Sequence, residues 1–235
     1  NPDALKQRIG VSLQTAALYP KLTVAEVLDL FRSFYRHGRP TEDLIAQLDL
    51  EEKRNTRTKE LSGGQRQRLA VALALVNDPE VVFLDEPTTG LDPAARRSLW
   101  DIVRSLQREG KCILLTTHYM EEAEVLCDRL AVMDHGQILE SGTVTELVDS
   151  RFKERAVRFR QIDGLGDATL ATFSGVSTVK HENGDVLLYT RDVPATIGAV
   201  LEATEALGME PQDLAVRRAT LEDVFLELTG RALRD

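Results

Sequence analysis

The sequence has few cysteines, no long apolar run and no excess of basic residues, and each absence excludes a class of protein. Only two of the 235 residues are cysteines, which excludes a disulfide-stapled scaffold. The longest unbroken apolar run is eight residues, 69–76, whereas a membrane-spanning helix needs about 20. The net charge of −9 argues against sequence-independent binding of nucleic acid, although it is compatible with a local basic patch.

The cysteines and the first residue give two smaller expectations. Cys112 and Cys127 lie in apolar segments without metal-ligand spacing, so two buried, reduced thiols are expected. The first residue is Asn1, and no charged-then-apolar leader follows it. We therefore expect the chain to begin at a cut edge.

The residues that are present indicate a globular protein of one or two domains. Hydrophobic residues make up 43% and charged residues 29% of the chain, as in soluble globular proteins. Up to about residue 150, apolar segments such as 81–84 and 112–116 alternate with amphipathic segments such as 94–109. This alternation predicts an α/β domain with a parallel sheet and crossover helices. Residues 81–84 are apolar throughout, which predicts a strand that is buried on both faces.

The pattern changes after residue 150. The order strand-helix-strand-strand-helix-strand over residues 151–235 predicts a small α+β domain of the ferredoxin-like type. Asn183-Gly184 lies between two alternating segments, which predicts a hairpin turn. The predicted strands are 155–160, 176–181, 186–191 and 213–217, and the predicted helices are 168–173, 194–207 and 220–228.

Two adjacent carboxylates, Asp85 and Glu86, follow the apolar strand 81–84. Ligands of open α/β sheets bind at the carboxyl ends of the strands. An Asp at that place can hold Mg²⁺, and the next Glu can polarise a water for attack on a phosphoryl group. Taken alone, an apolar strand followed by Asp-Glu favours the simpler interpretation, in which the two carboxylates cap the turn 87–90.

The segment Leu61-Ser-Gly-Gly-Gln65 places a hydroxyl group and two glycines directly before a predicted helix. Exposed amides at a helix N-terminus form an anion site, and glycines let the backbone approach a phosphate closely. The alternative interpretation of this segment is an ordinary serine N-cap.

Taken together, these segments resemble the motifs of ABC transporter ATPases. Residues 61–65 resemble the signature motif, residues 84–93 resemble the Walker B strand with its D-loop, and Thr116-Thr-His118 resembles the segment of the switch histidine. Gln14 lies where this family has its Q-loop. Four motifs in this order make the resemblance, which covers about residues 1–150, highly specific.

The resemblance implies an architecture. It implies a partial P-loop NTPase-like ABC ATPase domain over residues 1–150, with a helical subdomain at residues 22–76. The α+β segment 151–235 is then an accessory domain. The segments 219–229 and 117–123 are similar to those of ATPases from drug-resistance and related ABC-2-type exporters.

The resemblance also implies a role for each matching residue, with ATP and Mg²⁺ as cofactors. Asp85 is expected to position Mg²⁺, Glu86 to act as general base and His118 to contact the γ-phosphate. Gln14 is expected to contact Mg²⁺ or water, and Asp92 to belong to the D-loop that meets a second subunit. The residues expected to close over ATP bound to a second copy, in a head-to-tail dimer, are Ser62, Gly63, Gly64 and Gln65.

One motif of the family is absent from the sequence. A P-loop has the pattern G-x-x-x-x-G-K-[ST], and the only Gly-Lys pair is Gly110-Lys111, which precedes a strand and is followed by Cys112. The resemblance therefore implies an N-terminally truncated subunit. These residues alone are expected to bind ATP no better than millimolar and not to hydrolyse it.

The predicted function is that of the ATP-hydrolysing subunit of an exporter of drugs, lipids or similar substrates. Its expected partners are membrane-spanning permease subunits and a second copy of itself, with no nucleic acid. The expected location is cytoplasmic, at the inner face of the cell membrane. Two alternatives stay open: a soluble, non-transport ABC ATPase, and a non-catalytic regulatory or interaction protein with an ABC-like fold. Glu86 and His118 argue against the non-catalytic alternative, because a protein that does not hydrolyse ATP has no chemical need for them.

Overall fold

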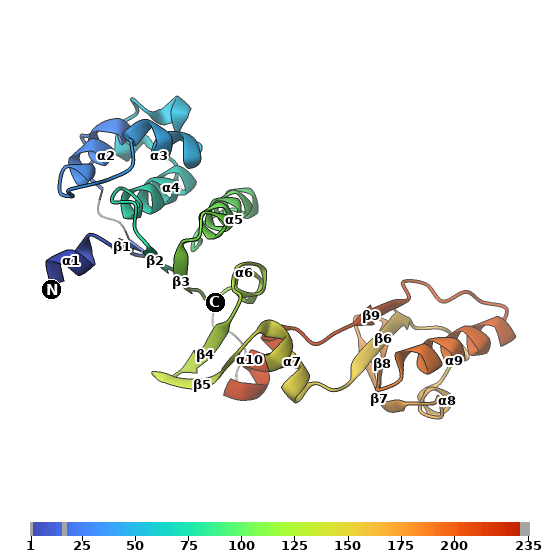
Figure 1. The fold of residues 1–235 in the computed structure, drawn as a ribbon. Helices are drawn as coiled ribbons and strands as arrows, with labels where there is room; N and C mark the ends of the chain where they lie inside the picture. The colour runs from blue at the N-terminus through green and yellow to red at the C-terminus, as the bar shows by residue number, and fades with distance from the viewer. Residues whose placement is uncertain (1, 16–17, 231–235) are drawn as a thin grey trace. The chain divides into compact units, whose positions relative to one another are not determined.

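The computed structural model describes residues 2–15 and 18–230, and the chain divides into two compact units (Figure 1). Unit 1 comprises residues 1–127 and unit 2 comprises residues 128–235. The boundary between these units lies before the domain division at residue 150 that the family resemblance implies. The division at residue 150 rests on where domains end in the family that the sequence resembles, whereas the two units are defined by contacts within this chain. The division at residue 150 therefore stays a prediction.

Unit 1 contains the predicted parallel sheet. Its three strands are β1 (Ile9–Ser12), β2 (Val81–Asp85) and β3 (Cys112–Thr116), in the order β1-β2-β3 with both pairs parallel. The α-helices of unit 1 are α1 (Pro2–Lys6), α2 (Val24–Arg32), α3 (Thr41–Gln47), α4 (Gly63–Ala74), α5 (Pro93–Arg108) and α6 (Met120–Leu126), and its 3₁₀ turns are η1 (Glu51–Lys53) and η2 (Thr58–Glu60).

Helices α2, α4 and α5 begin at the caps that local chemistry favours. Thr23 and Glu26 form a capping box at the start of α2, in which the Thr23 hydroxyl accepts the Glu26 N–H. Ser62 and Gln65 form the same arrangement at α4. At α5 the Asp92 carboxylate accepts two backbone N–H groups, and a proline follows it.

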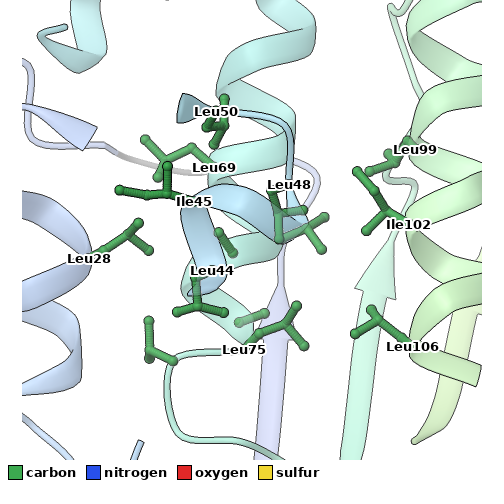
Figure 2. Close-up of a cluster of buried hydrophobic side chains, with 14 of the residues drawn as sticks. Leu28, Leu44, Ile45, Leu48, Leu50, Leu69, Leu75, Leu99, Ile102 and Leu106 are labelled. Atoms are coloured by element: carbon green, nitrogen blue, oxygen red, sulfur yellow. The ribbon is translucent and has the colours of Figure 1, made fainter. Parts of the chain in front are cut away.

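One face of the parallel sheet packs against helices. Val82 and Leu84 on β2 belong to a buried cluster with leucines of α4 and α5 (Figure 2). A Cβ on Gly10 would lie 1.9 Å from the carbonyl oxygen of Ala74. Glycine is therefore the residue that lets β1 approach the end of α4 this closely.

The other face of the parallel sheet is open among the described residues. Val11, Phe83 and Leu114 are neighbours in register on the three strands, and Val11 is 49% and Leu114 56% exposed. The expectation that the strands are buried on both faces is therefore wrong for the described residues, because their helices pack against one face. Cys112 lies on the open side and is exposed, and Cys127 is half-buried, so the expectation of two buried thiols is wrong.

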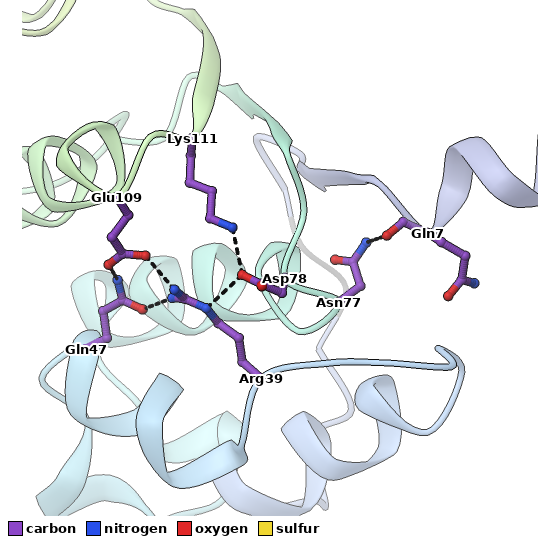
Figure 3. Close-up of polar contacts among 7 residues, drawn as sticks. All are labelled: Gln7, Arg39, Gln47, Asn77, Asp78, Glu109 and Lys111. Carbon is purple, nitrogen blue, oxygen red and sulfur yellow. Dashed lines mark hydrogen bonds and ion pairs between the residues drawn. The ribbon is translucent and has the colours of Figure 1, made fainter.

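A polar network joins four segments of unit 1 at the amino ends of β2 and β3 (Figure 3). Arg39 contacts Asp78 at 3.1 Å, and it contacts Gln47 and Glu109 at 2.5 Å each. The Lys111 ammonium group contacts the same Asp78 carboxylate at 2.7 Å. The network lies at the opposite end of the strands from the candidate site described below.

Unit 2 contains the predicted ferredoxin-like fold. Its antiparallel sheet has the order β7-β8-β6-β9, so the two strands of the β7–β8 hairpin lie together and the first strand lies between the third and the fourth. The elements of this fold are β6 (Arg155–Arg160), α8 (Asp167–Leu170), β7 (Val176–Glu182), β8 (Asp185–Thr190), α9 (Val193–Ala206) and β9 (Ala215–Arg217). The remainder of unit 2 comprises β4 (Leu130–Asp134), β5 (Gln137–Gly142), α7 (Val144–Arg151) and α10 (Leu221–Thr229).

The hairpin and the core of this fold follow from the sequence. Asn183 and Gly184 both have positive φ, 52° and 84°, as a two-residue type I′ turn requires. Phe159, fully buried on β6, packs with Leu188 of β8 and Val200 of α9. Helices α8 and α9 thus share one face of the sheet with the core. Among the residues that the structure describes, no helix is both long and apolar enough to span a bilayer.

Candidate active site

Three predicted site residues meet at the carboxyl end of the parallel sheet. Gln14, Glu86 and His118 each lie one or two residues beyond the end of a different strand, β1, β2 and β3. The Gln14 amide Nε2 donates to Glu86 Oε2 at 2.8 Å, and His118 Nδ1 lies 3.3 Å from the same oxygen. Parallel strands bring their carboxyl ends to one edge, so residues far apart in the sequence converge there.

The backbone of Glu86 is held in an uncommon conformation. Its φ is +45°, a left-handed value that is rare for a residue with a long side chain. The Glu86 N–H donates to the carbonyl oxygen and to the hydroxyl oxygen of Thr116, both at 3.1 Å. The end of β3 therefore supports a conformation that costs on the order of 1–3 kcal/mol, and such strain is concentrated at functional sites.

The two oxygens of the Glu86 carboxylate differ in their surroundings. Oε2 has three neighbours, because Thr89 Oγ1 donates to it at 3.0 Å in addition to Gln14 and His118. Oε1 has no hydrogen-bond partner within the described part of the chain. The Glu86 side chain is 31% exposed, so solvent reaches part of it.

Asp85 is oriented by a different bond. The Thr116 hydroxyl, opposite Asp85 in the strand register, donates to Asp85 Oδ1 at 2.5 Å. The second oxygen of Asp85 and the amide oxygen of Gln14 make no hydrogen bond to described residues. Carboxylate and amide oxygens suit Mg²⁺, which usually binds one or two protein oxygens and keeps several waters. No cluster of three or more His, Cys, Asp or Glu side chains with metal-binding geometry occurs in the described ranges.

An aromatic contact connects His118 to the start of α5. The rings of His118 and Tyr119 lie 4.1 Å apart, and the Arg96 guanidinium lies 4.1 Å from the centre of the Tyr119 ring. The same helix begins at Asp92, whose carboxylate accepts the N–H groups of Ala94 and Ala95 at 3.0 and 2.9 Å. Within this chain Asp92 thus acts as a helix N-cap.

The predicted signature residues lie at the start of α4. Ser62 accepts the Gln65 N–H at 3.3 Å, and Gln65 accepts the Ser62 N–H at 3.0 Å. Gly64 lies against Ala95 of α5, where an added Cβ would come within 3.2 Å. An added Cβ on Gly63 would meet nothing within 4 Å. No contact within the described chain therefore requires a glycine at position 63.

Sequence reasoning missed two residues that shape the site. Thr116 orients Asp85 and supports the Glu86 backbone, and Thr89 donates to the Glu86 carboxylate. Both lie inside segments that resemble family motifs, Thr89 in 84–93 and Thr116 in 116–118. The signal that would have identified Thr116 is its position opposite Asp85 on the neighbouring parallel strand. That position depends on the strand register, which the sequence does not give.

Comparisons with known proteins show which family the chain resembles along its length. A family model described as "ABC transporter" matches residues 1–89. The chain is 39% identical to the daunorubicin resistance ATP-binding protein DrrA3 of Streptomyces coeruleorubidus, over 97% of this chain and 74% of that protein. It is 40% identical to the Nod factor export ATP-binding protein I of Ralstonia nicotianae, over 98% of this chain and 73% of that protein.

Solved structures show the same likeness. A dimeric post-hydrolysis state of the ATP-binding cassette MJ0796, bound to ADP and Pi, matches with a TM-score of 0.54 and 27% identity, over 61% of this chain and 67% of that chain. An ATP-binding subunit of an ABC transporter matches with a TM-score of 0.56 and 26% identity, over 64% and 65% of the two chains.

The chain belongs to the ABC transporter ATP-binding proteins. It is an ABC ATPase coupled to transport, of the kind that powers exporters. Its fold is that of the P-loop NTPase-like ABC cassette.

Proposed function

We propose that Glu86 is the general base of ATP hydrolysis in this exporter subunit and that Gln14 and His118 hold it in place. The observation that supports this proposal is the convergence of three side chains, each following a different strand, on one carboxylate oxygen. A carboxylate whose second oxygen stays free can accept a proton from water. Oε1 of Glu86 is thus the proposed proton acceptor, while Oε2 anchors the side chain.

ATP and Mg²⁺ are the proposed cofactors, and the residues present fit the metal better than the nucleotide. Asp85 and the Gln14 amide oxygen supply the oxygen ligands that Mg²⁺ accepts, and the bound cation neutralises phosphate charge. The phosphate-binding amides and lysine of a P-loop do not occur in these 235 residues. The chain alone is therefore expected to bind Mg-ATP no better than millimolar and not to hydrolyse it.

The signature segment is proposed to act on ATP held by a second copy in a head-to-tail dimer. The structure of this chain supplies no internal reason for Gly63, whereas close approach of another molecule's phosphate to an open helix start supplies one. Ser62, Gly64 and Gln65 are assigned to the same surface, and Asp92 to the adjoining D-loop. The further proposed partners are membrane-spanning permease subunits. They would hold this subunit at the inner face of the cell membrane.

The transported substrate is proposed only as a class. The relatives are named for daunorubicin resistance and for Nod factor export. We propose a drug, a lipid or a similar small molecule as the substrate of the exporter that this subunit powers.

The test is Glu86→Gln in a chimaera that joins a P-loop-containing N-terminal segment of an ABC ATPase to these residues. Gln is nearly isosteric with Glu but cannot accept the proton, so turnover is expected to fall about 10²–10⁴-fold while ATP affinity is kept. The matched control is Glu52→Gln, which makes the same change on an exposed 3₁₀ turn. Near-normal hydrolysis by the Glu86→Gln chimaera would remove Glu86 from the mechanism.

A further inference from the structure

Unit 2 contains a cavity of about 370 Å³ on the sheet face that α8 and α9 leave uncovered. Part of its wall comes from Ala156, Tyr189 and Arg217, which the strand registers place side by side on β6, β8 and β9. Side chains alternate along a strand, so Ala156 lies on the face opposite Val157, a core residue. The small side chain of Ala156 between two large ones leaves the hollow.

Two connecting segments close the sides of this cavity. One is 151–154, which runs from the last residue of α7 to the start of β6, and the other is 218–219, which lies between β9 and α10. A second cavity of about 260 Å³ adjoins the first and shares Lys153 and Arg218 with it. The volumes suit a small molecule rather than a macromolecule.

The lining of the larger cavity carries an excess of positive charge in a chain whose net charge is −9. Three of its arginines have carboxylate partners, at 2.7 Å (Arg151–Glu140), 3.3 Å (Arg191–Glu154) and 3.2 Å (Arg217–Glu182). Lys153 and Arg218 have no hydrogen bond or ion pair to any described residue.

The two carboxylates in the lining do not compensate these two cations. Glu154 accepts bonds from Ser177 and Arg191. The Asp223 carboxylate accepts the N–H and hydroxyl of Thr220 in the capping box of α10. The cavity therefore holds two unpaired cations beside three paired ones, an arrangement that an anion would stabilise.

We propose that this cavity binds a phosphate ester. A guanidinium group matches the oxygens of a phosphate in a two-bond fork, and Arg218 is free to make it with Lys153 beside it. The aromatic rings of Phe152 and Tyr189 in the lining offer a surface for the body of the ester. A soluble phosphorylated metabolite and the headgroup of an anionic phospholipid share this chemistry.

The experiment titrates the 235-residue chain calorimetrically with inorganic phosphate and with glycerol 3-phosphate. Its second arm measures flotation with phosphatidylglycerol–phosphatidylcholine vesicles against pure phosphatidylcholine vesicles. Arg218→Ala is expected to weaken binding about tenfold or more, because it removes a charge-assisted contact. The matched control is Arg160→Ala, which removes one cation from the same sheet face outside the cavity and leaves Asp185 its contact with Arg158.

The arms distinguish the two sources of phosphate. A metabolite site is supported if the chain binds the soluble probes, if Arg218→Ala abolishes this binding and if Arg160→Ala leaves it unchanged. The same pattern in vesicle flotation alone supports a headgroup site. Binding to neither probe, or equal losses in both variants, would overturn the proposal, and Lys153→Ala provides a second variant should Arg218→Ala lose its thermal unfolding transition.

Discussion

The parallel sheet of unit 1 and the four-stranded sheet of unit 2 differ in the face that their helices leave uncovered. In unit 1 that face carries Val11, Phe83 and Leu114 side by side. In unit 2 the corresponding face carries cations, and Leu187 on it is only 2% exposed. The cross-strand neighbours of Leu187 are Arg158 and Lys180, whose aliphatic stems can cover it while their charged ends reach water.

The difference follows from the two kinds of sheet. An antiparallel sheet can face water on one side, so polar residues can complete its outer face, as they do in unit 2. A parallel sheet is usually covered on both faces, and its strands are apolar throughout. Strands β2 and β3 have this composition up to their last residue, although the helices of unit 1 cover only one face. The open face is therefore the place where substitutions should behave unlike those in a core.

The largest expected effect contrasts two leucines on adjacent strands of the parallel sheet. Leu84 is 1% exposed on the covered face and Leu114 is 56% exposed on the open face. Leu84→Ala is expected to lower the free energy of unfolding by about 2–5 kcal/mol, because it leaves a cavity in the core. Leu114→Ala should cost less than about 1 kcal/mol, since it removes little buried surface.

Urea denaturation followed by the fluorescence of Trp100, the single tryptophan and a residue of unit 1, measures both changes. Equal losses in the two variants would mean that the open face is covered in solution and would break the comparison.

A smaller effect concerns association. Exposed apolar patches favour association, so Leu114→Lys is expected to reduce self-association of the chain by roughly severalfold. Leu201→Lys makes the same change at a leucine that is 45% exposed on α9 of unit 2. It should have less effect, because Leu201 does not lie in a row of apolar residues on neighbouring strands as Leu114 does. Light scattering at several protein concentrations measures both, and an equal response would deny the open face of unit 1 any special role.

Most of the fold could be predicted from local pattern, and the misses have local causes. Strand β3 and strand β6 have the predicted bounds. Helix α7 was missed although Thr143 and Glu146 form a capping box, because only Leu147 of its eight residues is buried and it shows no apolar stripe. Helix α1 is a five-residue segment with no buried residue among those described.

The candidate site could be predicted in its membership but not in its detail. The resemblance of the motifs to those of ABC ATPases was enough to expect Gln14, Glu86 and His118 at one site. The gathering of three side chains around one oxygen of Glu86 depends on a left-handed backbone at that residue and on the position of Thr89. Neither follows from residue type, because a long side chain at positive φ contradicts local preference and is imposed by the rest of the fold.

The smallest predicted effect concerns the pH dependence of stability. It is measured at two carboxylates that each lie between two cations. Asp78 in unit 1 lies 2.7 Å from Lys111 and 3.1 Å from Arg39, whereas Asp185 in unit 2 lies 3.6 Å from Arg158 and 3.4 Å from Arg160. The hydrogen bond from Lys111, with the nearby charges, lowers the pKa of Asp78 below its ordinary value of 3.8. Such a group stabilises the folded state fully above its ordinary pKa, and this contribution is lost as the pH falls through the lowered pKa.

Asp78→Asn should therefore destabilise unit 1 by less than about 1 kcal/mol near neutral pH, since the pair is partly exposed. It should also flatten the fall in stability below about pH 4. Asn tolerates the positive φ of 51° at this position, so the substitution removes the charge without adding backbone strain. Urea unfolding from pH 3 to pH 7, followed by Trp100 fluorescence for unit 1 and by circular dichroism for the whole chain, measures the effect, with Asp185→Asn as the control in unit 2. A curve for Asp78→Asn parallel to that of the unsubstituted chain would show that the network of Figure 3 contributes nothing to acid stability.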